Sequence, residues 1–336
     1  MAYQDFKSYI ADKYMDLLHR EISDYVEAHH DGIGFHGHSV LTLCEQRVEN
    51  IEVKSLRCVD QPDPFVKIDV NVTADIVMEG LGTSKYDADR KTKWFTVHLD
   101  ASLRNGLEIR NSSAEEYNPQ KFEITTALDE YLIPYISTDM LEDEAEDFYE
   151  FYCWDAIYYE GWRLPVETIL QEMEIQYYEA PLPDNVFGRM YFRKTDVDVY
   201  EYTPYMIQKM IGKKERQIVH KDIEPGTMLI SHDRTFMDGI GSSLNTIAHE
   251  LVHWEKHQKF FKILSLLNED DDSLSCEVNP QMSSENLEGV QKAIWWAEWQ
   301  ANALAPRILM PRTMFLELFD QIYEEQSRTP YFQTGD

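Results

Sequence analysis

His249, Glu250 and His253 form an H-E-x-x-H run inside the segment SLNTIAHELVHWEKHQKFFKIL. In an α-helix, four residues advance by about 6 Å along the axis and about 40° around it, so both imidazoles project from one face toward a common point. Two nitrogen ligands arranged in this way suit a zinc ion, and the glutamate beside them suits a general base acting on water. The run therefore predicts a metal site with hydrolytic chemistry.

The helix that carries the run is expected to lie in a core. Ile247, Leu251 and Val252 give it an apolar face. We expect it to begin near Ser242 or Ser243, whose hydroxyl groups suit an N-cap. Two structural histidines with ordinary hydrogen bonds are the alternative that the run by itself leaves open.

A catalytic zinc site needs a third protein ligand and an open position. His257 lies about 12 Å from His249 along the same predicted helix, too far for both to bind one ion. The segment AIWWAEWQANALAPRILMP offers Glu298, which can complete a set of two histidines and one glutamate. Asn302, one turn later on the same face, can hydrogen-bond the far nitrogen of a ligating imidazole. A solvated Glu298 is the alternative, since most glutamates are exposed.

HELVH at 249–253 and EWQANALAPRILMP at 298–311 resemble the ImmA/IrrE family of zinc metallopeptidases, whose members carry H-E-x-x-H followed by an E-x-x-A-N pattern. The similarity covers roughly residues 165–320. It implies a gluzincin-like fold and Zn²⁺ as cofactor, and it implies cleavage of a transcriptional repressor of a mobile element or stress response. By resemblance the zinc ligands are His249, His253 and Glu298, the general base is Glu250, and Asn302 supports a ligand.

The N-terminal part of the chain changes from helical to strand periodicity. Apolar residues recur every three or four positions over 6–26, which predicts an amphipathic helix that ends near His29. Strict alternation over 65–80 predicts a long half-buried strand, and 93–105 repeats the pattern. An antiparallel sheet covered by the helix is the simplest arrangement.

The α+β chain is expected to contain two domains. Residues 140–160 form an acidic, partly aromatic helical pattern that ends at the break of 161–165, where we place the boundary. Residues 1–161 form an α+β domain for substrate recognition or regulation, and 162–336 form the zinc metallopeptidase domain. The second domain is expected to contain short strands at 174–180, 188–194, 196–202 and 226–233, followed by the two ligand helices.

The composition limits the partners of the protein. Its 61 acidic and 31 basic residues give a formal net charge of -30, which repels nucleic acid and anionic lipids but attracts a basic protein such as a DNA-binding repressor. The start of the chain has no signal-peptide core, and no apolar stretch approaches about 18 residues, so we expect a soluble cytoplasmic protein. The 4 cysteines form no C-x-x-C pair, which favours reduced thiols.

A zinc-dependent endopeptidase acting on a protein substrate is the leading hypothesis. The rival is a catalytically silent peptidase-fold module that binds or senses a partner, and the presence of three ligands and a base favours the enzyme. An aminopeptidase is disfavoured because no G-x-M-E-N text is present. The strand at 226–233 could present an edge to an extended peptide.

Several further features keep alternative interpretations. His220, His232 and several tyrosines are candidates for the donor that stabilises a tetrahedral oxyanion. The HHDGIGFHGH segment at 29–38 is either a second metal site or a glycine-rich loop with unliganded histidines. The tryptophans near the motif helices, Trp254, Trp295, Trp296 and Trp299, either pack around the site or contact substrate.

Overall fold

The structure is a computed structural model, and it describes residues 5–29, 44–80, 89–118, 127–153, 164–184, 186–202, 216–231, 240–267 and 287–327. The fold is α+β and divides into two compact units. The first unit contains the described residues up to Tyr135, together with those within 259–274 and 288–293, and the second contains the others. The expected boundary at 161 thus falls inside the second unit, so the acidic helix belongs with the H-E-x-x-H helix.

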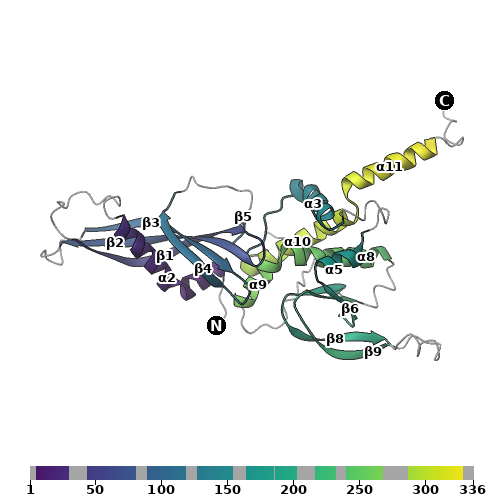
Figure 1. The fold of residues 1–336 in the computed structure, drawn as a ribbon, viewed down its shortest axis with the longest axis horizontal. Coiled ribbons are helices and arrows are strands. Elements are labelled where there is room, and N and C mark those ends of the chain that lie inside the picture. The colour runs from purple at the N-terminus through teal and green to yellow at the C-terminus, as the bar shows by residue number, and fades with distance from the viewer. Residues whose placement is uncertain are drawn as a thin grey trace. The chain divides into compact units, whose positions relative to one another are not determined.

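The first unit is built on an antiparallel sheet with strand order β4-β3-β2-β1-β5 (Figure 1). The strands are β1 Cys44–Asp60, β2 Phe65–Gly80, β3 Asp89–Ser102, β4 Glu108–Glu116 and β5 Ala127–Leu128. Alternate residues of β2, including Val66, Ile68 and Val70, are almost fully buried because successive side chains point to opposite faces. The prediction of a strand over 65–80 is confirmed, and that over 93–105 is confirmed as far as Ser102.

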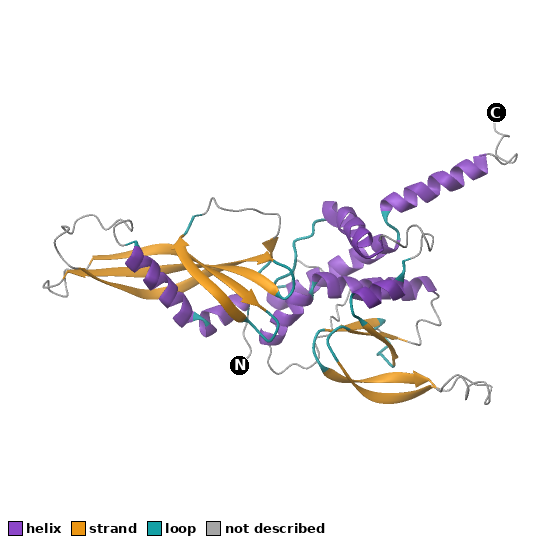
Figure 2. Cartoon of the chain, viewed as in Figure 1, coloured by secondary structure: helices purple, strands orange, loops and turns teal. Residues whose placement is uncertain are grey.

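Helices α1 Phe6–Lys13 and α2 Met15–Ala28 belong to the same unit. α2 packs against β1, β3 and β4, so the predicted helix-covered sheet is confirmed (Figure 2). The prediction of one continuous helix is wrong, because the chain leaves helical geometry at Tyr14. The Tyr14 hydroxyl donates to the Leu107 carbonyl at 2.5 Å, a tertiary contact that helical periodicity does not report.

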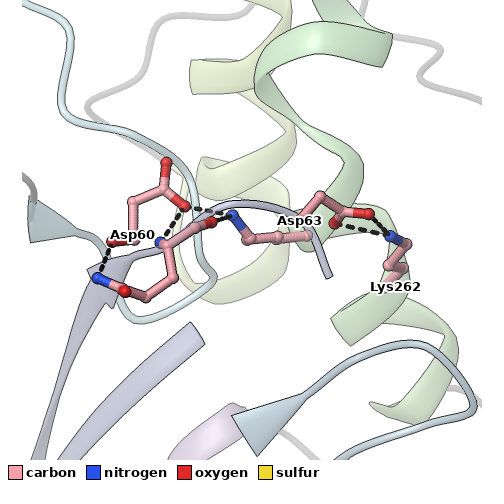
Figure 3. A network of polar contacts seen from close by, with 5 residues as sticks. Asp60, Asp63 and Lys262 are labelled. Atoms are coloured by element: carbon pink, nitrogen blue, oxygen red, sulfur yellow. Dashed lines mark hydrogen bonds and ion pairs between the residues drawn. The ribbon is translucent and has the colours of Figure 1, made fainter. Parts of the chain in front are cut away.

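Helix α9, Gln258–Leu267, is held against the turn between β1 and β2 by lysines. Lys259 Nζ donates to the Asp60 carboxylate, and Lys262 Nζ lies 2.9 and 3.0 Å from the two Asp63 oxygens (Figure 3). Partly exposed pairs of this kind contribute little individually. Their alignment along one helix nevertheless fixes which face of α9 meets the turn.

The second unit contains two small sheets and most of the remaining helices (Figure 1). Its strands are β6 Gln176–Ala180, β7 Gly188–Tyr191, β8 Thr195–Tyr202, β9 Arg216–Ile223 and β10 Thr227–Ser231. One sheet has the order β6-β10-β7 and the other pairs β8 with β9. The predicted edge position of the 226–233 strand is therefore wrong, because β10 lies between a parallel and an antiparallel neighbour.

The helices of this unit bury a common apolar core. They are α3 Leu141–Cys153, α5 Val166–Glu172, α8 Ile240–Lys256, α10 Gly289–Leu309 from Ile294 onward, and α11 Arg312–Ser327. The core includes Ile169, Met228, Leu251 and Leu304. Among the described residues, no helix is both long and apolar enough to span a bilayer.

Helix α8 carries the H-E-x-x-H run, but its ends differ from the prediction. It begins at Ile240, so Ser242 and Ser243 lie within the helix and the predicted cap is wrong. It ends at Lys256, and α9 begins at Gln258, so the predicted single helix is two helices. The break between them lies at His257, whose side chain is completely buried.

Candidate metal centre

Three side chains from two helices converge in the second unit. His249 and His253 lie one turn apart on α8, and their Nε2 atoms are 3.1 Å apart. Glu298 reaches them from α10, with Oε2 lying 3.4 Å from Nε2 of His249 and Oε1 lying 3.3 Å from Nε2 of His253. The structure therefore brings the three predicted ligands together as a group that could hold a metal ion.

The three side chains converge closely enough to contact one metal ion. With one ligand atom taken from each residue, the three atoms lie within 4.8 Å of one another. Two imidazoles also disfavour Ca²⁺ and Mg²⁺, which prefer oxygen ligands.

The electrostatics of the group favour a bound positive charge. Burial by itself raises the pKa of Glu298, but hydrogen bonds to His249 and His253 outweigh it and hold that pKa well below its usual range. Burial by itself lowers the pKa of His249, but the carboxylates of Glu298 and Glu250 outweigh it and raise that pKa. Glu298 is therefore an ionised carboxylate held between two imidazoles.

Glu250 is buried beside this group and touches the strand β7. The backbone N–H of Met190 donates to its carboxylate, and burial raises its pKa against the influence of the two imidazoles. A Cβ atom added at Gly188 would lie 2.8 Å from Oε1 of Glu250 and 2.7 Å from Cγ2 of Thr246. Any side chain here would force Glu250 or Thr246 to move, so Gly188 allows β7 to lie directly against the carboxylate.

Asn302 lies next to His249, as the E-x-x-A-N pattern predicts. Its Nδ2 donates to the backbone carbonyl of Glu298 at 2.9 Å, and its side chain also hydrogen-bonds His249. Ala301, the residue before Asn302, is completely buried. A small residue at this position lets α10 approach its neighbours closely.

Sequence reasoning considered His257 only as a ligand and did not consider Gln300. Nδ1 of His257 lies 3.0 Å from Nδ1 of His253, and Nε2 of His257 lies 2.9 Å from Oε1 of Gln300. Burial, together with the charge of His253, lowers the pKa of His257 to about 3, so the ring is neutral. The four-residue spacing from His253 to His257 was the available signal, since it places the rings side by side.

The other candidate residues contact different partners or lie outside the described residues. His220 is on β9, where Nδ1 lies 3.0 Å from Oδ1 of Asp198. His232 lies outside the described residues, as does the HHDGIGFHGH segment after His29. The site therefore gives no support to an oxyanion role for His220.

The tryptophans that flank the motif helices have mainly packing contacts. Trp254 stacks on Phe192 with ring centroids 5.6 Å apart, and Trp254 and Trp299 both pack against the core of the second unit. Trp296 is 36% exposed and meets Trp299 edge to face. Packing is thus the observed role for Trp254 and Trp299.

Comparison of the chain with protein-family models, with curated proteins and with solved structures gives no match. The geometry of the metal group and the H-E-x-x-H and E-x-x-A-N motifs that supply its residues therefore carry the functional assignment.

Proposed function

We propose that the protein is a zinc-dependent endopeptidase that hydrolyses peptide bonds of a protein substrate. The observation that carries the proposal is the convergence of His249, His253 and Glu298, whose ligand atoms lie within 4.8 Å of one another, with the buried Glu250 carboxylate beside them. A set of two histidines and one glutamate is typical of catalytic zinc in peptidases. The resemblance to the ImmA/IrrE family supports the same assignment.

The chemistry divides between the cation and Glu250. A zinc ion held by the three ligands supplies a Lewis acid that polarises a peptide carbonyl and lowers the pKa of water. Glu250 accepts the proton of the attacking water and delivers it to the leaving amine nitrogen. The Met190 N–H keeps the carboxylate aimed at the site.

The substrate is proposed to bind as an extended chain along β7. In the described part of the chain, β7 pairs only with β10, so its other side is a sheet edge. Such an edge binds a peptide through backbone hydrogen bonds. Because β7 also touches Glu250 at Gly188, a peptide held there lies beside the general base. The net charge of -30 favours a basic substrate, such as a DNA-binding repressor.

The test combines zinc content with peptide cleavage in the full chain. Wild type is expected to bind zinc stoichiometrically and to cleave a mixture of unstructured basic peptides, detected by mass spectrometry. Glu250→Gln is expected to keep zinc and to lose at least about 100-fold in cleavage rate, because the amide cannot accept the proton. Glu255→Gln makes the same change at an exposed position of α8 and serves as the control.

Two results would contradict the proposal. A wild type that loads zinc but cleaves no peptide would favour the binding or sensor module. Cleavage that survives in Glu250→Gln would remove this residue from the mechanism.

A further inference from the structure

A buried hydrogen-bond chain leads from α10 to the metal group by a second route, independent of Glu298. Oε1 of Gln300 lies 2.9 Å from Nε2 of His257, and Nδ1 of that ring lies 3.0 Å from Nδ1 of His253. Gln300, His257 and His253 are exposed by only 2%, 0% and 3%. Partners that are shielded from water in this way determine one another's proton positions.

The direction of each hydrogen bond follows from the atoms at its ends. A carbonyl oxygen can only accept, so Oε1 of Gln300 requires a proton on Nε2 of His257. A metal on Nε2 of His253 leaves the proton of that ring on Nδ1, so Nδ1 of His257 is the atom that must accept it. A neutral His253 with its proton on Nδ1 has an unprotonated Nε2, which is the atom that faces Glu298 and His249.

We propose that Gln300 is a positioning residue that, through His257, selects the His253 tautomer able to bind the metal. The inference rests on the metal site of the proposed function, but it does not require peptide cleavage. Without the glutamine acceptor, His257 can place its proton on Nδ1 and donate to His253. His253 would then carry its proton on Nε2, where it blocks the metal.

The two proposed ligand histidines thus have different hydrogen-bond partners. His249 is hydrogen-bonded directly by Asn302, whereas His253 is supported by a ring that needs its own partner. An outer hydrogen bond to a ligating histidine fixes its tautomer and orientation, and its loss typically costs about 10–100-fold in metal affinity. Because two hydrogen bonds link Gln300 to His253 through His257, the zinc affinity depends on Gln300, which is not itself a proposed ligand.

The experiment measures the Zn²⁺ dissociation constant of the full chain by competition with a chelating dye. Gln300→Leu, which removes the acceptor, is expected to weaken zinc binding by about 10–100-fold. Gln300→Glu, which keeps an acceptor, is expected to stay near wild type. Gln291→Leu makes the same change as Gln300→Leu at an exposed position of α10 and controls for the added leucine.

A double-mutant cycle separates tautomer selection from a packing role. His257→Phe should weaken zinc binding, and adding Gln300→Leu to it should cause no further loss, because the second residue acts only through the first. In zinc-loaded wild type, imidazole ¹H–¹⁵N spectra should show His257 protonated on Nε2 and His253 on Nδ1. In Gln300→Leu the His257 pattern should change.

The inference is overturned if Gln300→Leu binds zinc like wild type, if the losses in the double variant multiply, or if the spectra show the opposite tautomers. A wild type that binds zinc but cleaves no peptide overturns only the proposed peptidase. A wild type that binds no zinc overturns both.

Discussion

Histidines and carboxylates meet in both compact units, but in opposite arrangements. In the first unit, Nδ1 of His98 lies 2.7 Å from Oδ1 of Asp69 and Nε2 lies 3.4 Å from Oε1 of Glu115. One ring thus lies between two carboxylates, an arrangement in which a protonated imidazole donates from both nitrogens. In the second unit, His249 and His253 share the single carboxylate of Glu298.

The difference teaches which feature of such a cluster indicates a metal site. At His98 the hydrogen bond to Asp69 raises the pKa of the ring, and the side chain is 41% exposed. In the metal group, two ring nitrogens and two oxygens of one carboxylate converge on a single place that could hold a metal ion. Convergence of lone pairs, and not the residue types alone, distinguishes the two clusters.

The largest expected effect comes from breaking this convergence at Glu298. Glu298→Ala removes one of three protein ligands, so we expect zinc affinity to fall by more than about 100-fold and peptide cleavage to disappear. Zinc at a free concentration of about 100 times its dissociation constant stabilises a protein by about 2.7 kcal/mol. A chelator should therefore lower the melting temperature of the second unit in wild type but leave the variant unchanged.

The control for Glu298→Ala is Glu317→Ala, the same change at an exposed position of α11. It should retain both zinc affinity and the response to chelator. Tight zinc binding by Glu298→Ala would mean that the group holds its cation without the carboxylate, and the comparison with His98 would lose its basis.

Local sequence patterns predict some elements of each unit and miss others. In β2, the strict alternation of Val66, Ile68 and Val70 with polar residues specifies both the strand and its buried face, because the signal is local. The convergence of the three residues of the metal group was also predictable, since a four-residue helical spacing and an E-x-x-A-N pattern encode their positions. β9 was missed because its residues are mostly exposed and give no apolar period.

The features that sequence reasoning missed depend on tertiary contacts. The order β6-β10-β7 is set by which strands pair, and residue alternation within β10 does not report its neighbours. The end of α8 before His257 accompanies the burial of that ring against Gln300, which lies 43 positions along the chain. A local pattern has no access to either contact, so the outer hydrogen bonds of the site became visible only in the structure.

A smaller effect is expected from Gly188→Ala, which changes the position of the general base without touching a ligand. The added methyl overlaps Glu250 and Thr246, so the carboxylate must shift. A displacement near 1 Å can cost about 100-fold in rate. We expect the cleavage rate to fall by about 10–100-fold while zinc affinity, measured by dye competition, stays within about 2-fold because no ligand moves.

Gly241→Ala is the matched control for Gly188→Ala, since its Cβ would meet nothing within 4 Å. It should cleave peptide like wild type. Full activity in Gly188→Ala would show that β7 does not fix the position of Glu250, and a loss of zinc affinity would extend the role of β7 to the ligands.

The smallest effect is expected at His98, where the cluster is an ion pair and no metal is involved. The folded state raises the pKa of this histidine above its unfolded value near 6.5, so the stabilisation is fully present below that value. It is lost as the pH rises through the folded pKa. Because the pair is partly exposed, His98→Gln should cost no more than about 1 kcal/mol, measured by urea unfolding at pH 5, and nothing at pH 9.

Zinc affinity of His98→Gln should equal that of wild type, since His249, His253 and Glu298 all belong to the second unit. A stability difference that grows with pH would show that His98 is neutral in the folded protein, and the ion-pair assignment would fail. A drop in zinc affinity would show that the two clusters are coupled. The contrast between an imidazole that carries its own charge and imidazoles that share a cation would then no longer hold.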